Sequence, residues 1–158
     1  DGQSWRTLAP AACSRSYHST TVLLPDGRVL TGGGDTAVFD YQVFVPPYLL
    51  SHHPRPKITA APTQLGYSSL NPAWHTLGFD PLPPGEAIGH VTLVAPGSVT
   101  HSFDASQRYV ELVHGTITGT SLEFRSPLDA SHAPPGFYML FLVSAAGVPS
   151  LAEWVEVR

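Results

Sequence analysis

With 158 residues, the chain is the size of one ordinary domain, or of a compact domain with a short appendage. Its 42% hydrophobic residues can form a core, and its 13% charged residues do not give the high-charge composition of a disordered chain. The net charge is −4 and the basic residues form no stripe or cluster, which argues against nucleic acid or an anionic membrane as a partner.

Sixteen prolines and fourteen glycines predict many turns and few long helices. No stretch between them has the apolar period near 3.6 that is typical of a helix. The longest apolar run, Phe137–Val143, has the length of a strand and is far shorter than the ~20 residues that cross a bilayer. The sequence therefore predicts an all-β protein.

The first third of the chain predicts a hairpin and a third strand. Proline presets φ at a turn corner and Asp-Gly accepts positive φ, so Pro25-Asp26-Gly27 would connect Thr20–Leu24 to Arg28–Thr31. Another short strand, Tyr41–Val45, is expected to stop at Pro46-Pro47, because proline cannot donate a hydrogen bond within a sheet.

The proline-rich segment Ser51–Pro56 is a candidate linker to a second unit. After it, short apolar runs alternate with Pro/Gly turns, a spacing that favours a β-sandwich of about seven strands. Phe137–Val143 is apolar at every position, so it should be a central strand covered on both faces. The expected strands are Lys57–Thr59, His75–Phe79, His90–Val94, Arg108–Val113, Ser121–Phe124, Phe137–Val143 and Glu153–Val157.

Eight histidines against a single lysine, Lys57, are the unusual feature of the composition. Imidazole is the commonest protein ligand for copper, zinc and iron. However, no His-Glu-x-x-His helix, Cys-x-x-Cys pair or Gly-x-Ser-x-Gly elbow is present. Gly32–Gly34 is interpreted as a turn that ends a strand, because no Lys-Ser/Thr follows it as in a phosphate-binding loop.

Tyr17 and His18 stand side by side at the start of the first strand, and His101 lies in a turn after His90–Val94. Neighbours in a regular strand point to opposite faces, so Tyr17 and His18 could share a metal only at a strand end or in irregular backbone. Packed aromatic residues and an ordinary loop histidine are the plainer interpretations. Cys13 is interpreted as a small buried or incidental cysteine. We expect the other candidate metal ligands to be solvated: His52, His53, His114 and His132.

Nearly the whole chain resembles the C-terminal region of the galactose oxidase and glyoxal oxidase family, the copper-radical oxidases. The matching stretches occur in the family's order. They are Tyr17-His18-Ser19, Leu23–Val29, Gly32–Gly34, Val43–Leu49, Arg55–Thr59, Val99–Ser102, Gln107-Arg108, Pro135–Phe141 and Gly147–Ser150.

The resemblance implies a secreted protein in which a seven-bladed kelch-type propeller precedes an immunoglobulin-like, early-set β-sandwich. Residues 1–53 would then be the end of the last propeller blade and a linker, and residues 54–158 the sandwich. The chain begins at Asp1 with neither an initiator methionine nor a signal peptide, which indicates that something before it was removed. The expected partner is the missing N-terminal propeller of the same protein.

The resemblance also implies a copper site for the oxidation of a primary alcohol or aldehyde, with reduction of O2 to H2O2. Tyr17 would be the axial ligand, and His18 and His101 equatorial ligands. Imidazoles suit the tetragonal field that Cu(II) prefers, and a metal acidifies an alcohol that it binds. Tyr17 is the expected base for the released proton.

The radical cofactor of the family, a Tyr cross-linked to a Cys, comes from earlier blades, and Cys13 matches no motif cysteine. We therefore expect the chain to be inactive without its propeller. Residues 1–50 should pair with another chain, dock on the sandwich or be poorly ordered. The alternative is a non-catalytic sandwich for carbohydrate or protein binding with a vestigial metal site, in which Trp74 and Tyr67 could stack on sugars.

Overall fold

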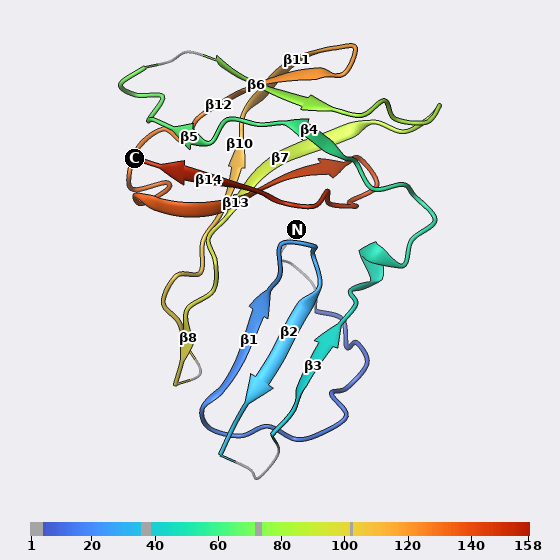
Figure 1. Ribbon diagram of the computed structural model, residues 1–158, viewed down its shortest axis with the longest axis vertical. Coiled ribbons are helices and arrows are strands. Elements are labelled where there is room, and N and C mark those ends of the chain that lie inside the picture. The colour runs from blue at the N-terminus through green and yellow to red at the C-terminus, as the bar shows by residue number, and fades with distance from the viewer. Residues whose placement is uncertain (1–4, 36–38, 72–73, 102) are drawn as a thin grey trace.

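The computed structural model describes residues 5–35, 39–71, 74–101 and 103–158 and consists almost entirely of strands (Figure 1). A single 3-10 helix, η1 (Pro47–Leu49), follows the third strand in these ranges. The strands are β1 (Ser19–Leu23), β2 (Val29–Gly33), β3 (Tyr41–Phe44), β4 (Ile58–Ala60), β5 (Gln64–Leu65), β6 (Trp74–Phe79), β7 (Ile88–Val94), β8 (Val99–Thr100), β9 (Phe103–Asp104), β10 (Tyr109–Leu112), β11 (His114–Thr118), β12 (Ser121–Arg125), β13 (Gly136–Ser144) and β14 (Glu153–Val157).

Two sheets form a sandwich, and a smaller sheet lies beside it. The sandwich has a five-stranded sheet in the order β10-β7-β13-β14-β5 and a four-stranded sheet in the order β11-β12-β6-β4. The smaller sheet has the order β1-β2-β3, and β8 and β9 form a separate two-stranded hairpin. In Figure 1 the smaller sheet lies below the sandwich, and the β8–β9 hairpin extends down toward β1. The described β pairs are antiparallel except β14 with β5.

The core lies between the two sandwich sheets. Leu93, Leu140 and Val155 from the five-stranded sheet meet Leu122 and Phe124 from the four-stranded sheet, and all five are fully buried. The central strand β13 pairs with β7 and β14 and is buried at every position from Tyr138 to Leu142. Consecutive side chains of a strand point to opposite faces, so this run shows that β13 is covered on both sides.

The predicted fold class and the predicted strands are confirmed, with ends that differ by at most two residues. Prediction missed β5, β8, β9 and β11. Of these, β5 and β11 belong to the sandwich, so its two sheets contain nine strands instead of about seven. Strands β5, β8 and β9 have only two residues each, too few to show an alternating pattern. Within the described ranges no helix is long and apolar enough to cross a membrane.

The turn between β1 and β2 forms as its residues predict. The Gly27 N–H donates to the Leu24 carbonyl at 2.9 Å, and Gly27 has φ +83°, a conformation that glycine adopts without strain. The Asp26 carboxylate accepts hydrogen bonds from the backbone and the guanidinium of Arg28, which lower the pKa of Asp26. The turn is therefore held in one shape, with its backbone carbonyls available to the sandwich.

Arg55 fastens this turn to the sandwich. Its guanidinium donates to the Asp26 carbonyl at 2.8 Å, to the Pro149 carbonyl at 2.9 Å and to the Ser150 carbonyl at 2.8 Å. The Ala152 N–H donates to the Pro25 carbonyl at 2.8 Å, so backbone also joins the two parts directly. Of the three expected arrangements for residues 1–50, the structure shows docking on the sandwich for the part that it describes, residues 5–35 and 39–50.

Two further contacts complete the junction. The hydroxyl of Tyr48, after β3, donates to the Gly27 carbonyl at 2.5 Å, and burial raises the pKa of that hydroxyl. Before β8, a Cβ on Gly97 would lie only 3.1 Å from Val22 Cγ1 on β1. Glycine therefore lets the hairpin base lie against the smaller sheet.

We predict that Arg55→Lys loosens this junction, because an ammonium group cannot reproduce the planar fork that reaches three carbonyls. The free energy of unfolding should fall by about 1–3 kcal/mol in urea titrations. Hydrogen exchange at the Ala152 amide should accelerate. Arg125→Lys is the control: the Arg125 guanidinium lies over the Trp74 ring and makes no contact at this junction among the described residues, so hydrogen exchange at the Ala152 amide should stay near wild type. Equal behaviour of the two variants would contradict the role of Arg55.

We also predict a pH dependence from His75 on β6. Burial lowers the pKa of His75, whose Nε2 lies 2.7 Å from the Ser126 hydroxyl. In the unfolded chain the ring takes up a proton near pH ~6.5, before the folded ring does, so stability is lost as pH falls through that range. His75→Gln should reduce the loss of stability between pH 7.5 and pH 5. An equal loss of stability in His75→Gln and the wild type would contradict the role of His75 burial.

Candidate metal centre

Tyr17 and His18 occupy a tight turn immediately before β1. The Ser19 N–H donates to the Ser16 carbonyl at 3.2 Å and closes the turn. His18 has φ +63°, in the left-handed region that residues other than glycine adopt rarely. The turn brings the two rings to one side, with centroids 3.9 Å apart and planes tilted by 36°. The irregular backbone that a shared site requires is therefore present at this strand end.

The glycine run Gly32–Gly34 at the end of β2 supports this turn. Gly33 has φ +70°, and a Cβ there would lie 2.8 Å from the His18 carbonyl oxygen, closer than real Cβ contacts come. The Gly34 N–H donates to the same carbonyl at 3.2 Å, and the Asp35 N–H donates to the Tyr17 carbonyl at 2.9 Å. The run thus ends the strand, as predicted, and also holds the turn that carries Tyr17 and His18.

His101 lies at the tip of the β8–β9 hairpin, with φ +53°. The Asp104 carboxylate accepts from the backbone N–H groups of Ser98 at 2.9 Å and Ser106 at 3.0 Å, which stiffens the base of the hairpin. Ser102, part of the predicted motif, lies outside the described residues. His18 and His101 are the two residues other than glycine with positive φ in the described part of the chain.

The structure brings the three predicted side chains together from two separate sheets. The ring centroids of Tyr17 and His101 are 5.3 Å apart, and those of His18 and His101 are 5.5 Å apart. Tyr17 is 50% exposed, and the imidazoles of His18 and His101 also face solvent. The cluster is therefore open to small molecules.

Hydrogen bonds occupy one nitrogen of each imidazole. His18 Nδ1 lies 2.8 Å from Asp35 Oδ1, and His101 Nδ1 lies 2.7 Å from Thr100 Oγ1. Sequence reasoning missed both partners, since neither a carboxylate 17 residues away nor an adjacent threonine carries a recognisable signal. Within the described residues, Nε2 of each ring has no hydrogen-bond partner in the protein.

The donor set fits a copper ion. Two imidazoles and a phenol are ligands that Cu(II) accepts, and one nitrogen of each ring is uncommitted. Metal–nitrogen bonds of about 2 Å put the centroids of two imidazoles on one ion roughly 4.5–6.5 Å apart, a range that includes the observed 5.5 Å. Within the described ranges no three His, Cys, Asp or Glu side chains lie close enough together to hold a metal, so a three-ligand site here has to include Tyr17.

The other histidines do not join the cluster, and two of them are not simply solvated. His53 Nδ1 lies 2.9 Å from Glu86 Oε1, and partly buried His114 places Nε2 3.1 Å from the Gly89 carbonyl, so the expectation of solvation was wrong for both. His132 remains an exposed residue, paired with Asp129.

Comparisons with known proteins agree on one family. Residues 55–157 match the family described as "Galactose oxidase-like, Early set domain". The chain is 37% identical to a galactose oxidase of Gibberella zeae, over 94% of this chain and 22% of that protein. It is 31% identical to the aldehyde oxidase GLOX1 of Arabidopsis thaliana, over 99% of this chain and 28% of that protein.

Among solved structures, a fungal alcohol oxidase of the AA5 family in complex with copper superposes with a TM-score of 0.80 at 27% identity. The superposition covers 95% of this chain and 32% of that chain. The chain thus spans between a fifth and a third of the length of these relatives. It belongs to the galactose oxidase-like early-set domain family.

Proposed function

We propose that the chain is the C-terminal part of a copper-radical oxidase that converts a primary alcohol or aldehyde and reduces O2 to H2O2. The observation that carries the proposal is the convergence of Tyr17, His18 and His101 from two sheets, with both histidines in rare backbone conformations. For an alcohol, RCH2OH and O2 would give RCHO and H2O2, a two-electron transfer that balances without another reactant. The names of the related oxidases support the same reaction class.

Tyr17, His18 and His101 would hold the copper ion. Copper bound there would supply a Lewis acid for the substrate oxygen and a one-electron redox centre. Tyr17, as tyrosinate in the metal-loaded site, would accept the hydroxyl proton of an alcohol and become a neutral phenol. The two histidines would hold their positions through backbone, since each lies in a braced turn.

We further propose that a propeller upstream of the chain completes the enzyme. Residues 1–53 would be the end of its last blade and a linker, and residues 54–158 would be the sandwich. The earlier blades would supply the cross-linked Tyr–Cys radical cofactor. Secretion belongs to the same proposal and is supported by the family resemblance.

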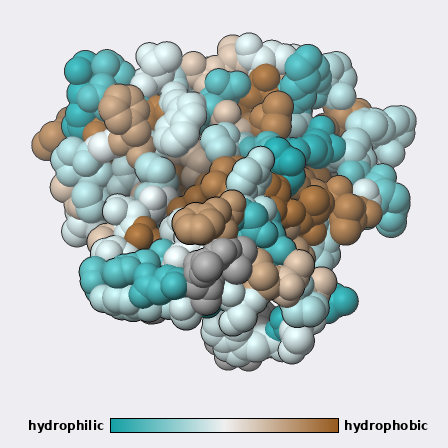
Figure 2. Space-filling model, turned by 60° about the horizontal axis from the view of Figure 1, so that its bottom comes forward, coloured by the Kyte–Doolittle hydropathy of each residue, from teal (hydrophilic) through white to brown (hydrophobic). Residues whose placement is uncertain are grey.

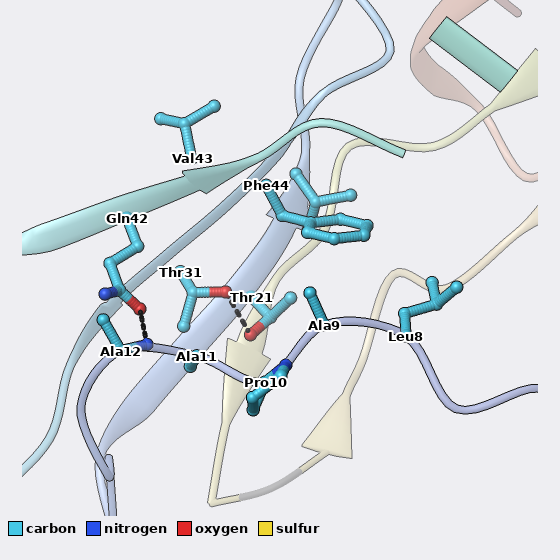
Figure 3. A pocket seen from close by; sticks show the side chains of 11 residues that line it. Leu8, Ala9, Pro10, Ala11, Ala12, Thr21, Thr31, Gln42, Val43 and Phe44 are labelled. Atoms are coloured by element: carbon cyan, nitrogen blue, oxygen red, sulfur yellow. Dashed lines mark hydrogen bonds between the residues drawn. The ribbon is translucent and has the colours of Figure 1, made fainter. Parts of the chain in front are cut away.

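The smaller sheet offers surface for such a neighbour. Residues 8–12 run across β1–β3, where the Ala12 N–H donates to Gln42 Oε1 at 3.2 Å, and an open groove of about 480 Å³ remains (Figure 3). Trp5 and Phe39 are fully exposed. Figure 2 shows hydrophobic side chains gathered across the middle of the molecule's lower face. Exposed apolar surface of this kind is typical of an interface.

The alternative, a sugar-binding sandwich, receives less support. The Arg125 guanidinium lies 4.7 Å over the Trp74 ring, and a Cβ on Gly115 would lie 3.0 Å from Trp74 Cζ3, so this 41% exposed ring already has two neighbours against it. Tyr67 packs against the core, and its hydroxyl donates to the Ala133 carbonyl at 3.0 Å. A sugar would have to compete with Arg125 for the Trp74 ring, and Tyr67 is committed to the core.

The test joins the chain to its upstream sequence, loads the protein with Cu(II) and measures peroxide production with alcohols and aldehydes. We predict that His18→Ala and His101→Ala each reduce the rate by more than about 100-fold, because each removes a metal ligand. His132→Ala, at an exposed histidine remote from the cluster, should retain wild-type activity.

Two outcomes would contradict the proposal. One is a copper-loaded complete protein that forms neither a radical absorption band nor peroxide. The other is an upstream sequence without the Tyr and Cys of the cross-link. Binding of carbohydrate that survives removal of both His18 and His101 would favour the alternative function.

A further inference from the structure

Asp35 forms a side-chain hydrogen bond with the imidazole of His18. Asp35 Oδ1 lies 2.8 Å from His18 Nδ1. The backbone also fixes Asp35 at this place, because its N–H donates to the Tyr17 carbonyl at 2.9 Å and the preceding Gly34 N–H donates to the His18 carbonyl at 3.2 Å. The carboxylate therefore faces the ring from a position that three hydrogen bonds define.

The chemistry of the two Nδ1 partners differs. An ionised carboxylate only accepts hydrogen bonds, so Asp35 requires that His18 Nδ1 carry the proton. The Nε2 of a neutral ring then bears the lone pair. The Thr100 hydroxyl, 2.7 Å from His101 Nδ1, can donate or accept, so it allows either tautomer of that ring. Of the two histidines, only His18 has a partner that selects the form able to bind a metal through Nε2.

We propose that Asp35 is a positioning residue that keeps the Nε2 lone pair of His18 available to an ion shared with Tyr17 and His101. This inference rests on the proposed copper site and adds to it a residue that acts through His18. A carboxylate that orients a ligating imidazole also raises the basicity of that ligand. Asp35 therefore tunes the strength of metal binding without touching the metal.

The experiment has two arms. In the metal-free chain at pH 8, the ¹⁵N shifts of the imidazoles report the tautomer, and we expect His18 to be protonated at Nδ1 in the wild type. Asp35→Ala should release the ring into a mixture of tautomers. In the complete protein, titration of Cu(II) against a competing chelator should show binding weakened by about 10–100-fold in Asp35→Ala and by less in Asp35→Asn.

The control is Glu111→Gln. Glu111 Oε1 lies 2.8 Å from His90 Nδ1, and this pair is about as exposed as the Asp35–His18 pair, with side chains 49% and 53% exposed against 55% and 51%. The control should change neither the tautomer of His18 nor the copper affinity. Urea titrations of Asp35→Asn and Asp35→Ala establish that each variant is folded before its affinity is interpreted.

The outcomes separate this inference from the proposed function. If the wild type binds copper and Asp35→Ala binds it equally well, the role of Asp35 is overturned and the copper site stands. If His18 in the wild type is protonated at Nε2, the inference fails in the first arm alone. If the wild type binds no copper, both proposals are overturned.

Discussion

The arrangement of the molecule depends on the hydrogen bonds that one guanidinium makes with three backbone carbonyls. Arg55 lies in the proline-rich segment Ser51–Pro56, and it reaches the turn of the smaller sheet on one side and Pro149 and Ser150 on the other. Hydrogen bonds from a charged donor contribute about 1.5–3 kcal/mol each. Burial lowers the pKa of Arg55, but a guanidinium remains protonated in proteins. The three hydrogen bonds of Arg55 therefore keep a charged donor. Since Tyr17 and His18 lie on one side of this junction and His101 on the other, the junction sets the distance between them.

Backbone strain is concentrated where the candidate ligands lie. A residue other than glycine in the left-handed region costs on the order of 1–3 kcal/mol and persists only where its surroundings impose it. The left-handed conformation of His18 is imposed by the Gly33–Asp35 segment, which hydrogen-bonds to the turn from the opposite strand. The conformation of His101 is imposed by the β8–β9 hairpin. The Asp104 carboxylate stiffens the base of this hairpin through two backbone hydrogen bonds. These two conformations allow the rings of Tyr17, His18 and His101 to converge, which a regular strand would prevent.

Much of the fold could be predicted because its signals are local. The Pro25-Asp26-Gly27 turn, the uninterrupted apolar run of β13 and the prolines before the sandwich each act through their own neighbours. The convergence of Tyr17 with His101 could not be derived from spacing, because 84 residues separate them and the contact depends on how two sheets dock. Only the family resemblance brought these residues together before the structure was known. Asp35 and Arg55 gave no local signal. The partner of Asp35 is the His18 ring and the partners of Arg55 are three backbone carbonyls, and only the tertiary structure brings these groups close.

The placement of the candidate ligands on two sheets has a mechanical consequence. An ion held by Tyr17, His18 and His101 would act as a cross-link between the smaller sheet and the sandwich, at the end of the junction opposite Arg55. Binding energy that favours only the docked arrangement adds to the stability of that arrangement. Metal occupancy and the rigidity of the whole chain would therefore rise and fall together, and loss of the ion would leave the two parts joined through the junction around Arg55 and the Ala152–Pro25 backbone hydrogen bond.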